Sequence, residues 1–526
     1  MQILSLNKGK SYYKRDQNMK NKSPKIIKFL FPTFANILWM ATFIITLIQG
    51  RRMMNQDGDL GFHLTLGRYI LDQRNIPLHD MFSHTMIGKP VTQHEWLSGL
   101  IFAITDRLFR FEGIIFLCAL LTATTFWFVY KLVRAKSQNL IVSIAVVSLT
   151  IITSMVHWLA RPHLFTFLLL AVWMLILHQL REGKLRRWWM LPVLMLLWTN
   201  LHGAFIVGFI TWFIYGIGVG WDAFRFKNLD IYTLPPNFWR YYLLSGITSF
   251  FVSLINPSGL GLWKTVITHI GNKYLADHTL EFQSPNFHWI SFWPFLVFIG
   301  FLVVILGSNK KKMRSGDLLN AAAWLLLGLY GARNVPLFAI VTAPLLAQGL
   351  DNLLLSAVSR FRFMNYLKNL NVRLKKVDSQ LKGYFWPILS IIIVIAGLSI
   401  GFRFDYDGEG YSFDPEVFPV HAVNWLEENP QEGEMFNYYT WGGYLLHRLW
   451  PENRVYIDGK VDFYGEDFTR QYAQVIWLQK GWEDVLDQYN VSWVIFPPNE
   501  PAAGAIQSEL GWELIYEDDT AVIIRR

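Results

Sequence analysis

Acidic and imidazole side chains that can do chemistry gather in short segments between apolar runs. The stretch NQDGDLGFH places Asp57 and Asp59 two residues apart, with His63 close behind, and HEW places His94 beside Glu95. Carboxylates chelate hard divalent cations, which prefer oxygen ligands, or act as a general base toward an acceptor hydroxyl or amide. We therefore expect Asp57, Asp59 and Glu95 to be catalytic.

Four later segments add two arginines, further histidines and one more carboxylate. HWLARPH contains Arg161 and His163, TNLHG contains His202, LEFQSP contains Glu281, and GARNVP contains Arg333. A guanidinium group matches a phosphate through a bidentate fork, so a phosphate-bearing substrate is expected beside the arginines. The expected substrate- and phosphate-binding residues are Arg161, His163, His202, Arg333, His63 and His94. The expected ligands of a divalent cation, Mg²⁺ or Mn²⁺, are Asp57, Asp59 and Glu281.

Arg161 and Arg333 each lie within a residue or two of the end of an apolar run. An ionisable group at membrane depth is costly, which favours a functional interpretation. The competing interpretation is an arginine at a helix end whose head group reaches back to the aqueous interface.

The elements that must position these residues are membrane helices. Hydrophobic residues make up 52% of the 526 residues and charged residues only 17%, against about 25% charged in soluble proteins. Several apolar runs approach the roughly 20 residues that cross a bilayer. We expect about eleven transmembrane helices, near residues 27–50, 113–131, 140–158, 164–180, 188–201, 204–221, 241–255, 290–307, 318–330, 335–353 and 385–402.

The weaker apolar run at residues 96–109 decides the topology. It is short and contains Asp106 and Arg107, as expected of a helix in the membrane interface. If it does not cross, every later basic cluster falls on the same, cytoplasmic side as the Lys-rich N-terminus. All the candidate site residues then lie outside the bilayer on one face. If it crosses, that grouping is lost.

This topology divides the chain into three parts. Residues 1–26 form a basic cytoplasmic N-terminus, and residues 27–403 form a multi-pass module of the inner (plasma) membrane with a long first external loop, residues 51–112. Residues 404–526 form an extracytoplasmic domain with 23 acidic and 7 basic residues. The basic residues elsewhere occur as short clusters between spans, so nucleic-acid binding is not expected.

The C-terminal domain alternates helix and strand patterns, as expected for a soluble α/β domain. We expect helices at residues 421–428 and 482–489, strands at 434–437, 454–458 and 491–496, and a final hairpin from 512–516 and 520–524. Two glycine-rich stretches, TWGG and IDGKVDFYG, follow predicted strands. Asp458 and Asp462 in the second stretch either reach toward the membrane-side cleft or serve as ordinary turn residues.

These segments resemble the GT-C superfamily of integral membrane glycosyltransferases. DGDLGFH is similar to the acidic motif of their first external loop, which maps onto Asp57 and Asp59. HEW resembles the second acidic point of the lipid-linked mannosyl and aminoarabinose transferases, which maps onto Glu95. LEFQSP looks like the Ser-Glu-His-Gln-Pro pattern of oligosaccharyltransferases, with Glu281 matched and Phe282 in place of the His.

The resemblance implies transfer of a sugar from a polyprenyl-phosphate-linked donor, among membrane lipids, to a glycan, lipid or protein acceptor of the cell envelope. One alternative is a transporter or flippase of lipid-linked glycans, which should show internal repeats or charges at mid-span. The ionisable residues here lie at one membrane edge instead. The other alternative is a non-catalytic membrane protein of envelope assembly.

Overall fold

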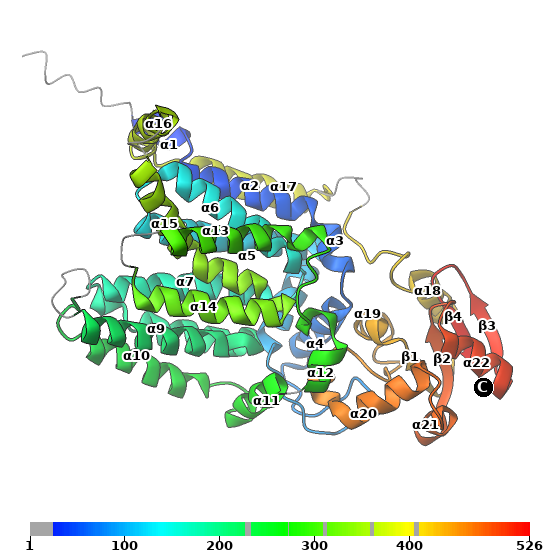
Figure 1. Cartoon of the computed structure of the whole chain (residues 1–526). Helices are drawn as coiled ribbons and strands as arrows, with labels where there is room; N and C mark the ends of the chain where they lie inside the picture. Colours follow the sequence, from blue (N-terminus) through cyan, green and yellow to red (C-terminus); the bar gives the residue numbers. More distant parts are fainter. Residues whose placement is uncertain (1–24, 227–232, 272, 309–312, 358–361, 404–409) are drawn as a thin grey trace, which may run out of the picture.

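The computed structural model describes residues 25–226, 233–271, 273–308, 313–357, 362–403 and 410–526. A bundle of roughly parallel helices carries a small mixed domain at one end, and α1 (Lys25–Leu30) and α16 (Arg362–Asp378) lie at the other end (Figure 1). The predicted basic N-terminus, residues 1–26, lies outside the described residues apart from the start of α1.

Each predicted span overlaps a helix of the bundle. Among the described residues, seven helices are long and apolar enough to cross a membrane, whereas α8, α10, α14 and α17 have 12 to 16 residues. The bundle comprises α2 (Phe34–Ile48), α5 (Trp96–Lys136), α6 (Leu140–Ser154), α7 (His163–Arg181), α8 (Met190–Leu201), α9 (Ile206–Arg225), α10 (Phe238–Ser253), α13 (Trp293–Ser308), α14 (Ser315–Tyr330), α15 (Val335–Ala357) and α17 (Phe385–Ser399).

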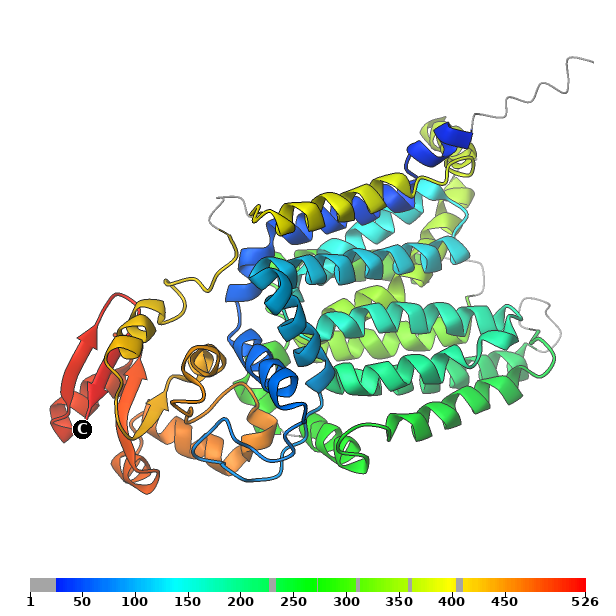
Figure 2. The same ribbon diagram turned by 180° about the vertical axis from the view of Figure 1, so that it is seen from behind.

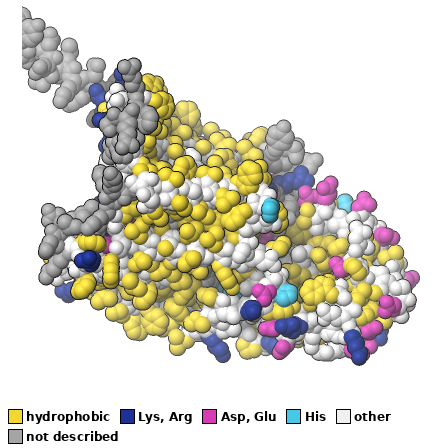
Figure 3. Space-filling model, viewed as in Figure 1, with side chains coloured by type: hydrophobic (Ala, Val, Ile, Leu, Met, Phe, Trp, Pro, Cys, Tyr) yellow, Lys and Arg dark blue, Asp and Glu magenta, His cyan; other side chains and the backbone are white. Residues whose placement is uncertain are grey.

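The surface of the bundle matches a lipid environment. Large apolar side chains such as Phe213, Phe251 and Val303 are exposed on it, and acidic side chains gather on the C-terminal domain instead (Figure 3). A contiguous apolar surface of this extent is not tolerated in water. The fold is therefore that of a polytopic α-helical membrane protein, as predicted, while the count of eleven crossings stays a prediction.

The apolar run at residues 96–109 ends where α5 is sharply kinked. Phe109 and Arg110 leave the helical conformation, and Arg110 has a φ of 52°. The segment before the kink packs along α4 (Asp59–Gln73), and both stand across the end of the bundle (Figure 2). Asp106, the charge that makes this run a poor span, accepts a hydrogen bond of 2.8 Å from Arg68 of α4.

Between the bundle and the C-terminal domain lie α3 (Gly50–Asn55), α4, α11 (Leu260–Gly271) and α12 (Lys273–His278) (Figure 1). The C-terminal domain is a four-stranded sheet of order β1-β2-β4-β3, with β1 and β2 parallel and the other neighbours antiparallel. Its strands are β1 (Glu434–Asn437), β2 (Val491–Phe496), β3 (Glu513–Glu517) and β4 (Val522–Arg525). Its helices are α18 (Val420–Glu428), α19 (Gly442–Leu449), α20 (Val461–Ile476), α21 (Trp482–Gln488) and α22 (Pro501–Leu510).

The strand predicted at residues 454–458 is wrong. This segment is buried but bridges the first loop, where Val455 pairs with Ser83. On its other side, Oδ1 of Asn437 accepts hydrogen bonds from the backbone N–H groups of Tyr456 and Ile457, at 2.8 and 3.3 Å. A side chain of β1 thus replaces the neighbouring strand, and the segment joins the C-terminal domain to the membrane module.

Candidate functional site

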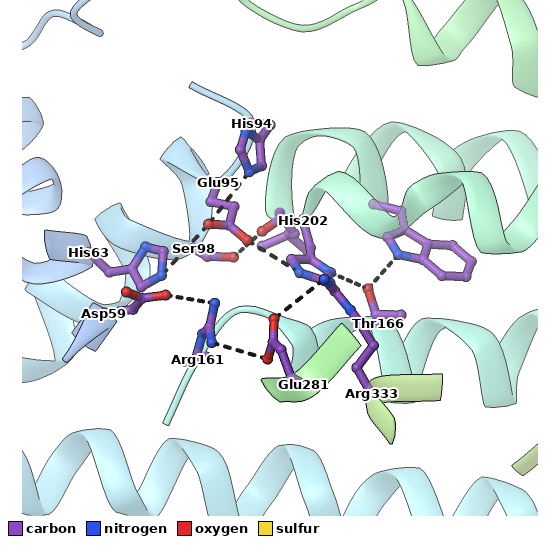
Figure 4. Close-up of polar contacts among 12 residues, drawn as sticks. Asp59, His63, His94, Glu95, Ser98, Arg161, Thr166, His202, Glu281 and Arg333 are labelled. Atoms are coloured by element: carbon purple, nitrogen blue, oxygen red, sulfur yellow. Dashed lines mark hydrogen bonds and ion pairs between the residues drawn. The ribbon is translucent and has the colours of Figure 1, made fainter. Parts of the chain in front are cut away.

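Arg161 is the centre of a charged cluster at the end of the bundle (Figure 4). Its Nη1 lies 2.6 Å from Oδ2 of Asp57, and its Nη2 lies 2.7 Å from Oδ2 of Asp59. Asp57 also forms an Asx turn just before α4, in which its Oδ1 accepts a 2.7 Å hydrogen bond from the N–H of Asp59. The two aspartates share one guanidinium group, and both keep about a fifth of their side-chain surface exposed.

Glu281 links Arg161 to Arg333. Glu281 lies on a single 3₁₀ turn, η5 (Leu280–Phe282), and Arg333 lies on another, η7 (Ala332–Asn334). Oε2 of Glu281 is 3.6 Å from Arg161, and its Oε1 is 3.4 Å from Nη1 of Arg333. The guanidinium of Arg333 also stacks on Phe282, 4.4 Å from the ring centroid. The aromatic ring that stands where the resembled motif has a His therefore supports the second arginine.

Three imidazoles surround the third carboxylate of the predicted catalytic set. Glu95 lies 3.3 Å from Nε2 of His202, 3.7 Å from Nε2 of His63 and 3.8 Å from Nε2 of His94. His63 is almost fully buried, and its Nδ1 has no hydrogen-bond partner in the part of the chain that the structure describes. These histidines, predicted to bind substrate, lie around Glu95 in this structure.

A hydrogen-bond chain orients His202. The indole N–H of Trp198 donates to Oγ1 of Thr166 at 2.8 Å, and Oγ1 of Thr166 lies 2.8 Å from Nδ1 of His202. Because Thr166 accepts from Trp198, its own O–H is free to donate to Nδ1, which assigns the ring proton of His202 to Nε2. That nitrogen lies 3.3 Å from Oε1 of Glu95 (Figure 4).

Burial and neighbouring charges give the three carboxyl groups different pKa values. Burial raises the pKa of Asp59 to about 8, because Asp57 and other carboxylates add to the effect and Arg161 offsets only part of it. Burial also raises the pKa of Glu95. Burial of Glu281 acts in the same direction, but Arg333 and Arg161 outweigh it and lower the pKa of Glu281 to about 2. Glu281 is thus a fixed anion, whereas Asp59 can exchange a proton near neutral pH.

His163 lies apart from the carboxylates in its described contacts. Its Nε2 is 2.9 Å from the backbone carbonyl of His157, and the two rings pack 4.6 Å apart. His157 itself places Nε2 3.8 Å from Oε2 of Glu281. His163 is therefore better placed to support His157 than to bind phosphate, which was its predicted role.

The carboxylates as arranged do not fit the predicted divalent cation. Arg161 occupies the space between Asp57, Asp59 and Glu281, and a guanidinium there competes with a metal ion for the same oxygens. Within the described residues, no group of three or more His, Cys, Asp or Glu is placed to hold a metal ion.

A cavity of about 300 Å³ adjoins the cluster. Its walls come from the first loop, α11 and the start of α20, and its lining residues are Thr92, Gly261, Lys264, Thr265, Thr268, His269 and Asp462. Thr92 lies two residues before His94, and the ring of His269 packs 5.4 Å from that of Phe282, the ring under Arg333. The cavity lies at the lower end of the size range of ligand sites, with hydroxyl, ammonium, imidazole and carboxylate groups around it.

Several residues near the cluster were not anticipated from the sequence. Thr166 and Trp198 orient His202 from inside apolar runs, where a single hydroxyl or indole carries no signal. Tyr439 of the C-terminal domain is a third such residue. It lies close enough to Asp59 and Asp57 that their negative charges, together with burial, raise the pKa of its phenol. The glycine-rich stretch TWGG, which begins one residue after Tyr439, was the only hint at that region.

Neither a family model nor a curated protein matches this chain. Among solved structures, it is similar to ArnT from Cupriavidus metallidurans, described as bound to undecaprenyl phosphate. The TM-score is 0.48 at 10% sequence identity, with 93% of this chain and 97% of that chain covered. A likeness at this level says nothing of the substrate of the present chain, and we base the proposed function on the contacts described above.

Proposed function

We propose that this chain is a glycosyltransferase that moves a sugar from a polyprenyl-phosphate-linked donor to a cell-envelope acceptor at the extracytoplasmic membrane surface. The observation that carries the proposal is the cluster of Arg161 with Asp57, Asp59 and Glu281, at the end of an apolar bundle and under a soluble domain. Such a place joins a lipid-soluble substrate to an aqueous one.

Arg333 is the better phosphate ligand of the two arginines. Arg161 already contacts three carboxylates, two of them at 2.6 and 2.7 Å. Arg333 has one carboxylate at 3.4 Å and keeps 28% of its side chain exposed. Its stacking on Phe282 holds the guanidinium plane without using its N–H donors. Those donors are available to a phosphate at the membrane edge.

The proposed reaction is a direct displacement with inversion. Asp59 takes the proton from an acceptor hydroxyl, and the hydroxyl oxygen forms a bond to the anomeric carbon of the sugar. The bond between that carbon and the phosphate oxygen breaks, and the electron pair leaves with the polyprenyl phosphate. Arg333 stabilises the charge that develops on the phosphate. A pKa of about 8 suits Asp59 to this task, because a general base works best when its pKa lies near the working pH.

Glu95 is proposed to bind the acceptor. Burial lowers the pKa of both His63 and His202, which keeps them neutral. Neutral imidazoles beside Glu95 leave its charge uncancelled. The hydroxyl-rich cavity beside His94 offers room for a sugar ring.

The test is sugar transfer by the full chain in lipid nanodiscs. The donor is a membrane lipid extract in which the sugars linked to polyprenyl phosphate are radiolabelled. The acceptor is an extract of the cell envelope. Asp59→Asn should lower transfer by about 100-fold or more, the range expected for loss of a general base. Glu509→Gln, an exposed change on α22, is the matched control.

Full transfer by the Asp59→Asn chain would refute the proposed role. Movement of labelled lipid across proteoliposomes by the unmodified chain, with no covalent transfer, would favour the transporter instead.

A further inference from the structure

One turn of the C-terminal domain reaches the charged cluster. Gly459 lies directly against the carboxylate of Asp59, and a Cβ atom added to it would overlap Oδ1 of Asp59. Asp462, three residues later, lines the cavity. The segment Asp458–Asp462 therefore touches both the proposed base and the space proposed for a sugar.

Lys460 anchors this turn to the membrane module. Its side chain is only 11% exposed, with Nζ 3.6 Å from Oδ2 of Asp458 and 3.9 Å from Oδ1 of Asp80 in the first loop. Nζ also lies 4.1 Å from the ring centroid of Phe62, on the same helical turn as Asp59. The N–H of Lys460 donates to Oδ1 of Asp458 at 2.9 Å, which fixes the shape of the turn.

The contact is supported by backbone packing on both sides of the turn. Gly61 of α4 meets the carbonyl of Gly443 at the start of α19, and a Cβ on either glycine would overlap main-chain atoms of the other element. Gly442 meets the carbonyl of Ile457 in the same way. Main chain packed this closely leaves little room for the turn to slide relative to α4.

We propose that the turn Asp458–Lys460 is a positioning element for Asp59, so that the site is complete only when the C-terminal domain is docked. The turn lies against Oδ1 of the carboxylate and Oδ2 contacts Arg161, while 22% of the side chain stays exposed for an acceptor hydroxyl. Removing water from that side also accounts for the direction of the shift in the pKa of Asp59, since burial is its largest cause. The inference rests on the proposed function for what Asp59 does, but its geometry can be tested without a substrate.

The first experiment is a double-mutant cycle on unfolding in detergent. Gly459→Ala should lower the melting temperature by several degrees, because the new methyl group overlaps Asp59. In the Asp59→Ala background most of that loss should disappear, since the space is then open. The matched control is Gly504→Ala on α22, where an added Cβ meets no atom within 4 Å, and it should lose nothing in either background.

Equal losses from Gly459→Ala in both backgrounds would overturn the proposed contact. If Gly459→Ala is too unstable to purify, the proposal still predicts that the double variant with Asp59→Ala is recovered as folded protein. Failure to recover the double variant would count against the proposal.

The second experiment asks whether the turn acts on the chemistry. Gly459→Ala should reduce kcat for sugar transfer at least tenfold while its affinity for undecaprenyl phosphate stays within twofold of the unmodified chain. A loss of undecaprenyl phosphate binding with unchanged kcat would contradict a positioning role. If the unmodified chain transfers no sugar at all, the proposed function fails while the stability cycle still reports on the contact.

Discussion

The raised pKa of Asp59 predicts that Asp59→Asn stabilises the folded chain above neutral pH. In the folded chain the pKa is about 8, against an ordinary value of 3.8. The folded state therefore holds a proton that the unfolded state releases. The stability that this proton contributes is fully present below about pH 4 and is lost as the pH rises toward 8.

The size of the effect follows from the shift. A shift of about four pKa units at ~1.4 kcal/mol per unit gives an upper limit of about 6 kcal/mol. The side chain of Asp59 keeps 22% of its surface exposed, and water there offsets part of this cost, so we expect about 2–4 kcal/mol. The amide of Asn cannot ionise, and the variant should not pay this cost at any pH.

The assay is equilibrium unfolding in mixed micelles between pH 4 and 9, for the unmodified chain and Asp59→Asn. Burial lowers the pKa of His63 and His202 and raises that of Glu95, so each chain also has a pH dependence from these groups. The difference between the two chains isolates Asp59. It should grow by about 2–4 kcal/mol between pH 4 and 8, whereas Glu509→Gln should show no such growth. Parallel curves for the two chains would refute the proposed protonation of Asp59.

Three further changes test the rest of the site. Arg333→Gln should weaken binding of undecaprenyl phosphate by about 10- to 100-fold, the loss of one charge-assisted contact, measured by ligand-induced thermal shift; unchanged binding would place the phosphate elsewhere. Thr166→Val should cost about 1–3 kcal/mol in unfolding experiments, because His202 and Trp198 each lose a buried partner, and Thr166→Ser should restore most of it. Asn437→Leu should destabilise the C-terminal domain by a similar ~1–3 kcal/mol, seen as earlier protease cleavage; cleavage at the normal rate would contradict the bridging role of this side chain.

The sequence was enough to predict the helical bundle and, in the C-terminal domain, the helices α18 and α21 and the four strands of the sheet. The helices α19, α20 and α22 were not anticipated, and α19 and α20 begin in stretches taken for glycine-rich loops. Apolar runs report membrane helices directly, because lipid selects them by length and composition. The end of the apolar run at residue 109 even coincides with the kink of α5. The strand at 454–458 was misassigned because β-propensity does not specify a partner, and here the partner is the side chain of Asn437 and not a strand.

The candidate site was predicted as a set of residues but not as a set of pairs. Asp57, Asp59, Arg161, Glu281 and Arg333 do meet, as expected of residues predicted on one face of the membrane. Most of these charged groups, however, form ion pairs with one another. The spacing of residues along the chain does not reveal which arginine keeps N–H donors available. The close packing of glycine main chain around Asp59 could not be predicted either, because the packed segments come from the membrane module and from the C-terminal domain.

The docking of the C-terminal domain has a consequence for the order of events during synthesis. The hydroxyl of Thr85 donates to the carbonyl of Tyr456, a contact between residues 371 positions apart. A growing chain has its acidic first loop and all its membrane helices long before the turn at Gly459 exists. The proposed role of the turn implies that Asp59 stays open to water until Gly459 arrives against it. On that proposal, the chain gains activity only after its C-terminal domain has folded.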